Sequence, residues 1–119
     1  MDPMTTAEVI RAGELELRPA DHIALADGRT MPLSTRELEL LAALVSREGR
    51  VVPREELFHL VWRAPMRATD RSVDVYVHKL RTKLGSALPH LAFIHTHFGF
   101  GYRFSPEPSH PFHKAATSR

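Results

Sequence analysis

The sequence predicts a single α+β domain with an N-terminal antiparallel sheet, three helices and a C-terminal β-hairpin. Three observations predict this class. Short apolar segments alternate with turn residues between residues 9 and 33, which is typical of short strands. Three segments with the apolar spacing of amphipathic helices follow between residues 34 and 84. Two β-rich segments then flank the tip Phe98-Gly99-Phe100, where glycine permits a tight turn.

The first 33 residues predict three or four short antiparallel strands. Turn residues separate the apolar segments, which are Val9-Ile10, Leu15-x-Leu17, Ile23-x-Leu25 and Met31-x-Leu33. Asp27-Gly28 is the best hairpin signal, because a two-residue type I′ turn needs positive φ angles that glycine tolerates.

The first helix is predicted to begin with a capping box, in which Ser34 and Glu37 satisfy each other's backbone amides. Gly49 suits a left-handed exit as the residue after the helix. Its buried stripe is predicted to be Leu38, Leu41, Ala42 and Val45.

The second helix is predicted to start with Pro53 at its first position, because the missing amide of proline costs nothing there. Its core side consists of Leu57, Leu60 and Val61. Pro65 then predicts a loop of about seven residues between Trp62 and Thr69, since proline breaks helices.

The third helix is predicted over Thr69–Leu84, with Thr69 or Asp70 as its cap and Gly85 and Pro89 at its end. Its buried stripe is Val73, Val77, Leu80 and Leu84. Its outer face carries mostly hydrogen-bond donors, and these residues are Arg71, Val75, His78, Lys79 and Thr82. Such a face suits the major groove, whose base edges and phosphates offer mostly acceptors. A solvated basic surface helix is the alternative.

The hairpin is predicted from Phe93–His97 and Gly101–Phe104. The domain is therefore expected to span residues 9–104, between disordered residues 1–8 and a disordered, basic tail at 105–119 that contains three prolines. Three helices, the third basic, followed by a hairpin is the order of a winged helix-turn-helix.

Charge and composition narrow the class of function. Residues 1–46 contain four arginines against eight acids, whereas residues 47–119 contain twelve lysines or arginines against six acids. The basic half predicts a surface for a polyanion. The chain contains no cysteine, which excludes disulfides and cysteine-bound zinc. Without a signal segment or an apolar run that spans a bilayer, we expect a cytoplasmic protein that makes no membrane contact.

The chain resembles the effector domain of OmpR/PhoB-type response regulators between about Val9 and Phe104. Four blocks in this order carry the resemblance: LSTRELELL at 33–41, RVVPREEL at 50–57 with Val61-Trp62, RSVDVYVHKLR at 71–81 and GFGYRF at 99–104. The resemblance implies a transcription regulator that binds specific double-stranded DNA, with the third helix in the major groove and the hairpin, or wing, along the minor groove.

The resemblance also implies roles for individual residues. Base contacts fall on Arg71, Val75, His78 and Lys79, and phosphate contacts on Arg54, Trp62, Arg81 and Tyr102. A loop that touches RNA polymerase is expected at residues 63–69, with Arg63, Met66 and Arg67. Binding to direct repeats as head-to-tail pairs is expected, and no cofactor is implied.

The chain departs from the family pattern in three ways. The wing reads Thr96-His97-Phe98-Gly99, so the arginine that often enters the minor groove is missing. Phe98 then offers apolar contact either with sugars or with a neighbouring protomer. Pro53 stands where a serine cap is frequent, and the receiver domain is absent from these residues.

Other interpretations apply to single residues. Val75 is either a thymine-methyl contact or an incidental exposed valine, and Trp62 and Tyr102 serve packing, phosphate binding or both. Asp74 lies near the start of the third helix, where it is expected to have a structural role and to order a neighbouring arginine such as Arg71. His95-x-His97 offers two imidazoles but no third metal ligand at fixed spacing. The sequence shows no nucleophile-base set and no phosphate-binding glycine loop, so we do not expect an enzyme. A protein-interaction module that docks on RNA polymerase or a receiver domain is the alternative function.

Overall fold

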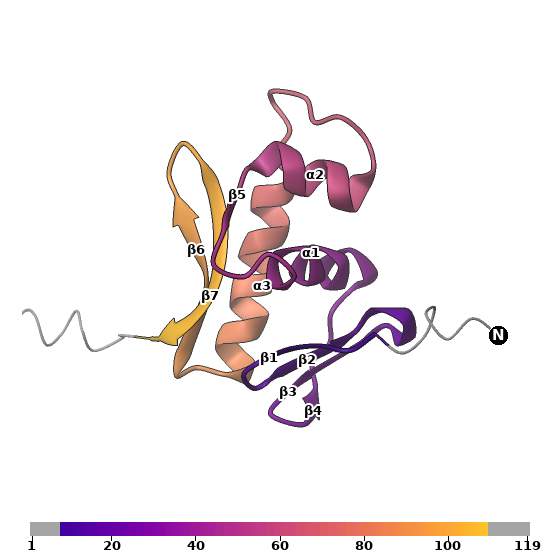
Figure 1. Ribbon diagram of the computed structural model, residues 1–119, viewed down its shortest axis with the longest axis vertical. Coiled ribbons are helices and arrows are strands. Elements are labelled where there is room, and N and C mark those ends of the chain that lie inside the picture. The colour runs from indigo at the N-terminus through magenta and orange to yellow at the C-terminus, as the bar shows by residue number, and fades with distance from the viewer. Residues whose placement is uncertain (1–7, 110–119) are drawn as a thin grey trace, which may run out of the picture.

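The computed structural model describes residues 8–109, in which two antiparallel sheets and three helices share one core (Figure 1). The four-stranded sheet lies beneath the helices, and the three-stranded sheet stands along one side of the third helix. The predicted α+β arrangement is confirmed. The disorder expected for residues 1–7 and 110–119 lies outside the described residues.

The N-terminal sheet has the order β1-β2-β3-β4. Its elements are β1 (Ile10–Ala12), β2 (Leu15–Arg18), the short 3-10 helix η2 (Pro19–Asp21), β3 (Ile23–Ala26) and β4 (Arg29–Thr30). Asp27 and Gly28 have φ angles of 52° and 78°, which confirms the predicted type I′ turn. The fourth strand differs from expectation, because Met31 lies beyond it as a buried residue.

Helix α1 (Thr35–Val45) begins with the predicted capping box. The Glu37 amide donates to Ser34 Oγ at 3.2 Å, and the Ser34 amide donates to Glu37 Oε1 at 2.8 Å. The helix ends earlier than predicted. Gly49 does adopt a positive φ of 87°, but it belongs to the turn before β5 (Val51–Val52) and donates its amide to Phe104 O.

Helix α2 (Arg54–Trp62) follows β5 directly. Pro53 is its N-cap and not its first helical residue, because its ψ of 150° leaves it extended. Leu57 and Val61 are buried as predicted, Leu60 is only half-buried, and Phe58 is an additional core residue.

Helix α3 (Ser72–Ala87) buries all four residues of its predicted stripe, Val73, Val77, Leu80 and Leu84. It starts three residues later and ends three residues later than predicted. Gly85 does not end the helix, because Leu88, just beyond the helix, is also buried and donates its amide to Leu84 O. This anchoring outweighs the modest helical cost of one glycine.

The second sheet has the order β5-β7-β6, with β6 (Leu91–His97) and β7 (Gly101–Pro108) forming the predicted hairpin. Strand β7 continues through Ser105–Pro108, so the predicted boundary at Phe104 and the start of the tail are wrong. Beyond Arg103 one edge of β7 has no neighbouring strand in the described chain, since β5 pairs only with Tyr102 and Arg103. Prolines are tolerated on such an open edge.

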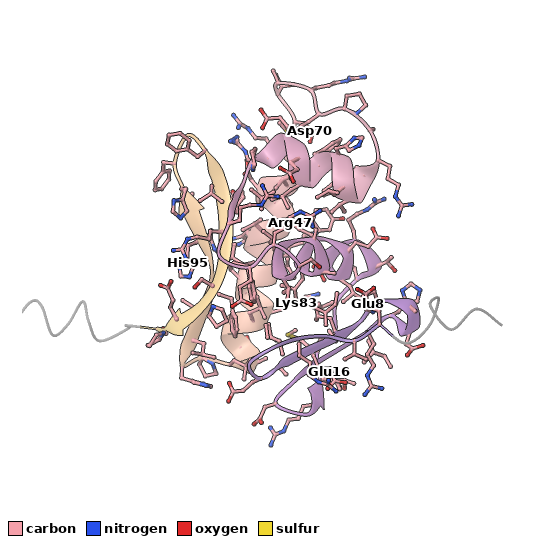
Figure 2. All side chains as sticks on the ribbon, in the orientation of Figure 1. Glu8, Glu16, Arg47, Asp70, Lys83 and His95 are labelled. Carbon is pink, nitrogen blue, oxygen red and sulfur yellow. The ribbon has the colours of Figure 1, made fainter. Side chains whose placement is uncertain are left out.

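Lys83 lies where α3, α1 and the four-stranded sheet meet (Figure 2). Its Nζ is 2.7 Å from Glu37 Oε1 and donates to Pro32 O at 2.7 Å. Glu37 is the buried charged residue of the described chain, and its capping role fixes its position at the start of α1. The Lys83–Glu37 pair therefore attaches α3, the helix with the basic face, to the start of α1.

No helix within residues 8–109 combines the length and the apolar composition needed to cross a bilayer.

Candidate nucleic-acid interface

The outer face of α3 is solvent-exposed along its whole length. The exposed residues include every predicted outer-face residue, Arg71, Val75, His78, Lys79 and Thr82. Val75 is 47% exposed, so it does not belong to the core. Lys79 Nζ lies 4.8 Å from the ring centre of Tyr76, which holds the ammonium group over the helix surface.

Asp74 joins three elements at the start of α3. Arg54 Nε of α2 lies 3.2 Å from Asp74 Oδ1, and the two residues form an ion pair. The buried Nε–H does not point at the oxygen well enough to count as a hydrogen bond. The Tyr102 hydroxyl of β7 donates to the same oxygen at 2.5 Å. The sequence predicted a structural Asp74 that orders an arginine such as Arg71, and the structure places Arg54 there. Asp74 thereby orients the Arg54 guanidinium, which is the predicted phosphate contact.

Tyr102 is 7% exposed and its hydroxyl proton is used by Asp74. Burial, the hydrogen bond to Asp74 and the charge of Asp74 together raise the pKa of Tyr102 to about 12. A phosphate oxygen needs a free donor, so this geometry differs from the predicted direct phosphate contact. It makes Tyr102 a residue that positions Asp74.

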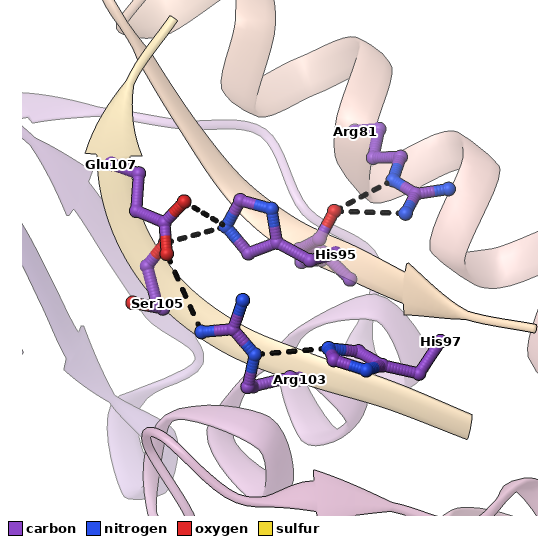
Figure 3. Close-up of polar contacts among 7 residues, drawn as sticks. Arg81, His95, His97, Arg103, Ser105 and Glu107 are labelled. Carbon is purple, nitrogen blue, oxygen red and sulfur yellow. Dashed lines mark hydrogen bonds and ion pairs between the residues drawn. The ribbon is translucent and has the colours of Figure 1, made fainter. Parts of the chain in front are cut away.

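Arg81 connects α3 to the hairpin (Figure 3). Its Nε and Nη2 donate to Ile94 O at 3.1 and 2.8 Å, and Nη2 also donates to Thr96 Oγ1 at 2.7 Å. The guanidinium carbon lies 5.7 Å from the centre of the Tyr102 ring. Within the described chain these bonds involve Nε and Nη2 but not Nη1, and they fix the angle between the hairpin and the basic helix.

A row of polar side chains runs along the hairpin behind its tip (Figure 3). Arg103 Nε donates to His97 Nε2 at 3.0 Å, and His95 Nε2 lies 2.8 Å from Ser105 O. A hydrogen bond from Ser105 is the main cause that lowers the pKa of Glu107, and the neighbouring His95 and the Arg103 guanidinium lower it further. Both imidazoles therefore have protein partners, and residues 8–109 hold no group of three side chains suited to a metal ion.

The tip of the hairpin stands clear of the domain. Phe98 is 87% exposed and Phe100 is 75% exposed, whereas Thr96 and His97 are half-buried. Beside the tip lies a groove of about 210 Å³, bordered by residues of α2, α3 and the hairpin, among them Arg54 and Asp74. The tip, α2 and the first half of α3 lie at one end of the molecule (Figure 1).

Trp62 is half-buried at the opposite border of the basic face. It stacks on Phe58 with 4.9 Å between ring centres, and Tyr76 approaches it edge-on at 5.5 Å. Arg36 lies 5.2 Å from the ring centre and donates to Val61 O. Trp62 thus has the packing role that the sequence allowed, and Arg36 is a cation at this border that the sequence analysis did not single out. Its place in the first turn of α1 carried no signal of a partner in α2.

The loop between α2 and α3 extends away from the helices (Figure 1). Arg63 ends α2 in a left-handed conformation, with φ of 58°. Arg63 and Arg67 are exposed, whereas Met66 packs partly against the core. Asp70 Oδ1 accepts the Ser72 amide at 2.8 Å. The N-cap residue of α3 is nevertheless Arg71, whose side chain makes no capping bond, so the predicted cap at Thr69 or Asp70 is wrong because the helix starts later than predicted. The two arginines remain available to a partner.

These features are matched by a family of known proteins. The family model described as "Transcriptional regulatory protein, C terminal" matches residues 28–104. The chain belongs to this OmpR/PhoB-type family. The family consists of winged-helix domains of transcription regulators and not of enzymes, which confirms the resemblance seen in the sequence.

Curated relatives of this OmpR/PhoB-type domain are regulators. The chain is 39% identical over 99 residues to the transcriptional regulatory protein CreB of Escherichia coli, covering 82% of the chain and 43% of CreB. It is 34% identical over 105 residues to the phosphate regulon transcriptional regulatory protein PhoB of Shigella flexneri, covering 88% of the chain and 45% of PhoB. The chain therefore spans less than half the length of these relatives.

Solved structures agree with the fold of this OmpR/PhoB-type domain. The DNA-binding domain of CpxR from E. coli superimposes with a TM-score of 0.75 at 30% identity, over 82% of this chain and 96% of that one. The RstA DNA-binding domain from Klebsiella pneumoniae, solved in complex with the RstA box, gives a TM-score of 0.75 at 29% identity, over 85% and 100%.

Proposed function

We propose that this domain is the part of a transcription regulator that binds specific double-stranded DNA, with α3 in the major groove and the β6–β7 wing along the adjacent minor groove. The observation that carries the proposal is the exposed face of α3, where Arg71, His78 and Lys79 surround the exposed Val75. Asp74 is the one acidic residue in the first turns of that helix, and its carboxylate forms an ion pair with Arg54 and accepts a hydrogen bond from Tyr102. The RstA domain that was solved with its DNA box supports the same use of this fold.

Within this proposal the residues divide by chemistry. Arg71, Val75, His78 and Lys79 read base edges, because they lie exposed on the face that enters the groove. Phosphates are bound by Arg54 and by Nη1 of Arg81, with the indole N–H of Trp62 at the far border. These phosphate contacts fix the register in which α3 meets the bases.

The partners proposed beyond DNA follow from the loop and from the family. Arg63, Met66 and Arg67 form a loop surface for RNA polymerase, and two domains bind head-to-tail on direct repeats. The cytoplasm is the proposed location, where both DNA and polymerase are accessible.

Selection from a random duplex library, followed by gel-shift assays, tests the proposal. We expect a sequence motif that repeats in one direction and a clear preference for selected over scrambled duplex. Lys79→Ala should weaken binding to the selected duplex by about 1–3 kcal/mol and have a much smaller effect on scrambled DNA.

Arg29→Ala is the matched control, because Arg29 is exposed on β4 at the other end of the molecule (Figure 1). Its replacement should leave both affinities unchanged. Failure to enrich any motif, or equal losses for both variants, would refute the proposed role of α3 and favour a protein-interaction module.

A further inference from the structure

The exposed apolar residues of this domain are concentrated at one end. Only three large apolar side chains in the described chain are exposed: Val75 at 47%, Phe98 at 87% and Phe100 at 75%. Val75 lies on the helix face proposed to enter the major groove, and the two phenylalanines lie at the hairpin tip beside it. Exposed phenyl rings cost free energy in water, so such a tip is typical of a surface that is covered in a complex.

Hydrogen bonds hold the hairpin tip in a defined conformation. The pairing of β6 with β7 continues to His97 opposite Gly101, and the Phe100 amide donates to His97 O at 2.8 Å. Gly99 supplies the positive φ of 82° that this three-residue turn needs. Arg81 also ties Thr96 to α3. The two rings are therefore presented at a defined distance from the basic helix.

The surroundings of the tip favour a polyanion over an acidic or apolar protein surface. Residues 96–103 contain Arg103 and His97 but no acid. Asp74, which borders the groove beside the tip, is already paired with Arg54, and Glu107 of β7 is paired with Arg103. The groove beside Phe98 is bordered by Arg54, which the proposed function assigns to a phosphate.

We propose that Phe98 and Phe100 form an apolar wedge for the minor groove of DNA. Phe98, the more exposed ring, enters between two base pairs and partly unstacks them, and Phe100 packs against the adjoining deoxyribose. Apolar side chains that enter the minor groove in this way open a base step and kink the duplex. The minor groove is only about 6 Å wide. It therefore admits the phenyl rings at the narrow hairpin tip, while the two β-strands of the hairpin stay outside. This inference rests on the proposed function, since it needs a duplex held by α3.

The wedge predicts a preference that hydrogen bonds do not explain. The step that receives Phe98 has to be easy to unstack, and pyrimidine–purine steps such as TA and CA are the most flexible. We therefore expect the selected motif to contain such a step at one fixed distance from the bases contacted by α3.

The test uses a duplex with a single half-site, on which no second copy of the chain can lie next to the wing. 2-Aminopurine is placed at each step of the flanking minor groove, and fluorescence is recorded on addition of protein. Wild type should raise the fluorescence at one step, because unstacking removes the quenching. Phe98→Ser should abolish this increase and weaken binding about tenfold, which corresponds to about 1.4 kcal/mol. The dependence of affinity on salt should not change, because no phosphate contact is lost.

Phe98→Leu is the conservative control, since leucine is also an effective wedge, and it should retain most of the fluorescence increase. Both substitutions lie on an exposed side chain, so equal thermal melts are expected. If the wild type and Phe98→Ser bind the half-site equally and no step brightens, the wedge is refuted while the DNA-binding function stands. A loss confined to duplexes with two half-sites would identify a second copy of the chain as the partner of the tip and would also refute it. If no duplex is bound at all, both the wedge and the proposed function are wrong.

Discussion

Val75 is an apolar residue whose side chain is nearly half exposed on a face that is otherwise polar. As a thymine-methyl contact it provides dispersion and a dry surface at one base pair. We expect that replacing this thymine by uracil costs the wild type about 1 kcal/mol of binding free energy. Val75→Ala should abolish the preference for thymine over uracil, as measured by gel shift on the two duplexes.

The buried neighbour Val73 provides the control for this residue. At 2% exposure, Val73→Ala should open a cavity and lower the free energy of unfolding by about 1–3 kcal/mol. Val75→Ala should leave the thermal melt unchanged. A lowered melting temperature with an intact thymine preference for Val75→Ala would contradict the groove-facing assignment of α3.

At the scale of elements, the contact between Lys83 and Glu37 decides how α3 is held on α1. Burial of the Glu37 carboxyl raises its pKa, but the hydrogen bonds from Lys83 and from Ser34 outweigh burial, so the pKa is lowered overall. A lowered pKa in the folded state means that the stabilisation is complete above the ordinary pKa of glutamate, about 4.3, and is lost as the pH falls through the lowered value.

Lys83→Met should therefore destabilise the domain by about 1–3 kcal/mol at neutral pH, because it leaves a buried carboxylate without its partner. Urea unfolding at neutral pH and at an acidic pH measures this difference, which should shrink as the pH falls through the lowered pKa of Glu37 and the carboxylate becomes protonated. Lys79→Met is the control on the same helix, because Lys79 is exposed and contacts a ring and not an acid. A loss for Lys83→Met that is the same at both pH values would show that Glu37 is not its cause.

Strand β7 approaches β5 closely at Gly101, and this contact predicts how a side chain at that position affects stability. A Cβ atom on Gly101 would lie 2.0 Å from Val52 O, and its φ of 151° disfavours any other residue. Gly101→Ala should lower the free energy of unfolding by more than about 2 kcal/mol, because backbone atoms of both strands have to move. Gly85→Ala is the matched control: nothing lies within 4 Å of its Cβ, and it should be neutral or stabilising by about 0.5–1 kcal/mol. Equal thermal melts for the two variants would contradict this packing.

For the whole molecule, the uneven charge predicts how binding depends on salt. The second half of the chain holds a net positive charge, while the first half is acidic. If about four to six phosphates are neutralised per domain, the logarithm of the affinity should fall with the logarithm of the salt concentration at a slope of about −4 to −5. A flat salt response in a fluorescence-anisotropy titration would contradict binding to the DNA backbone.

Arg54 isolates one of these phosphate contacts. Arg54→Ala should weaken binding to all duplexes similarly and make the slope less steep by about one unit. Asp74→Asn serves as its companion variant, because it keeps an acceptor for Tyr102 but removes the charge that orients Arg54. A loss that varied with base sequence would show that Arg54 reads bases instead.

The sequence alone determined the features that depend on neighbouring residues. The capping box of Ser34 and Glu37, the turn at Asp27-Gly28 and the buried stripe of α3 are all found as predicted. Each follows from periodicity or from hydrogen bonds that span at most a few residues, so local chemistry decides them. The four sequence blocks that resemble the OmpR/PhoB-type family occur in the expected order along the chain, and they were enough to predict the fold class.

Only the tertiary structure decided which distant residues meet. The sequence offered Arg71 as the partner of Asp74, and the fold brings Arg54 and Tyr102 there from two other elements. Residues 105–108 became strand because β6 lies beside them and one edge stays open, which their own proline-rich composition does not reveal. Contacts such as these join residues far apart in the chain, and they form because core packing has already placed the elements that carry them.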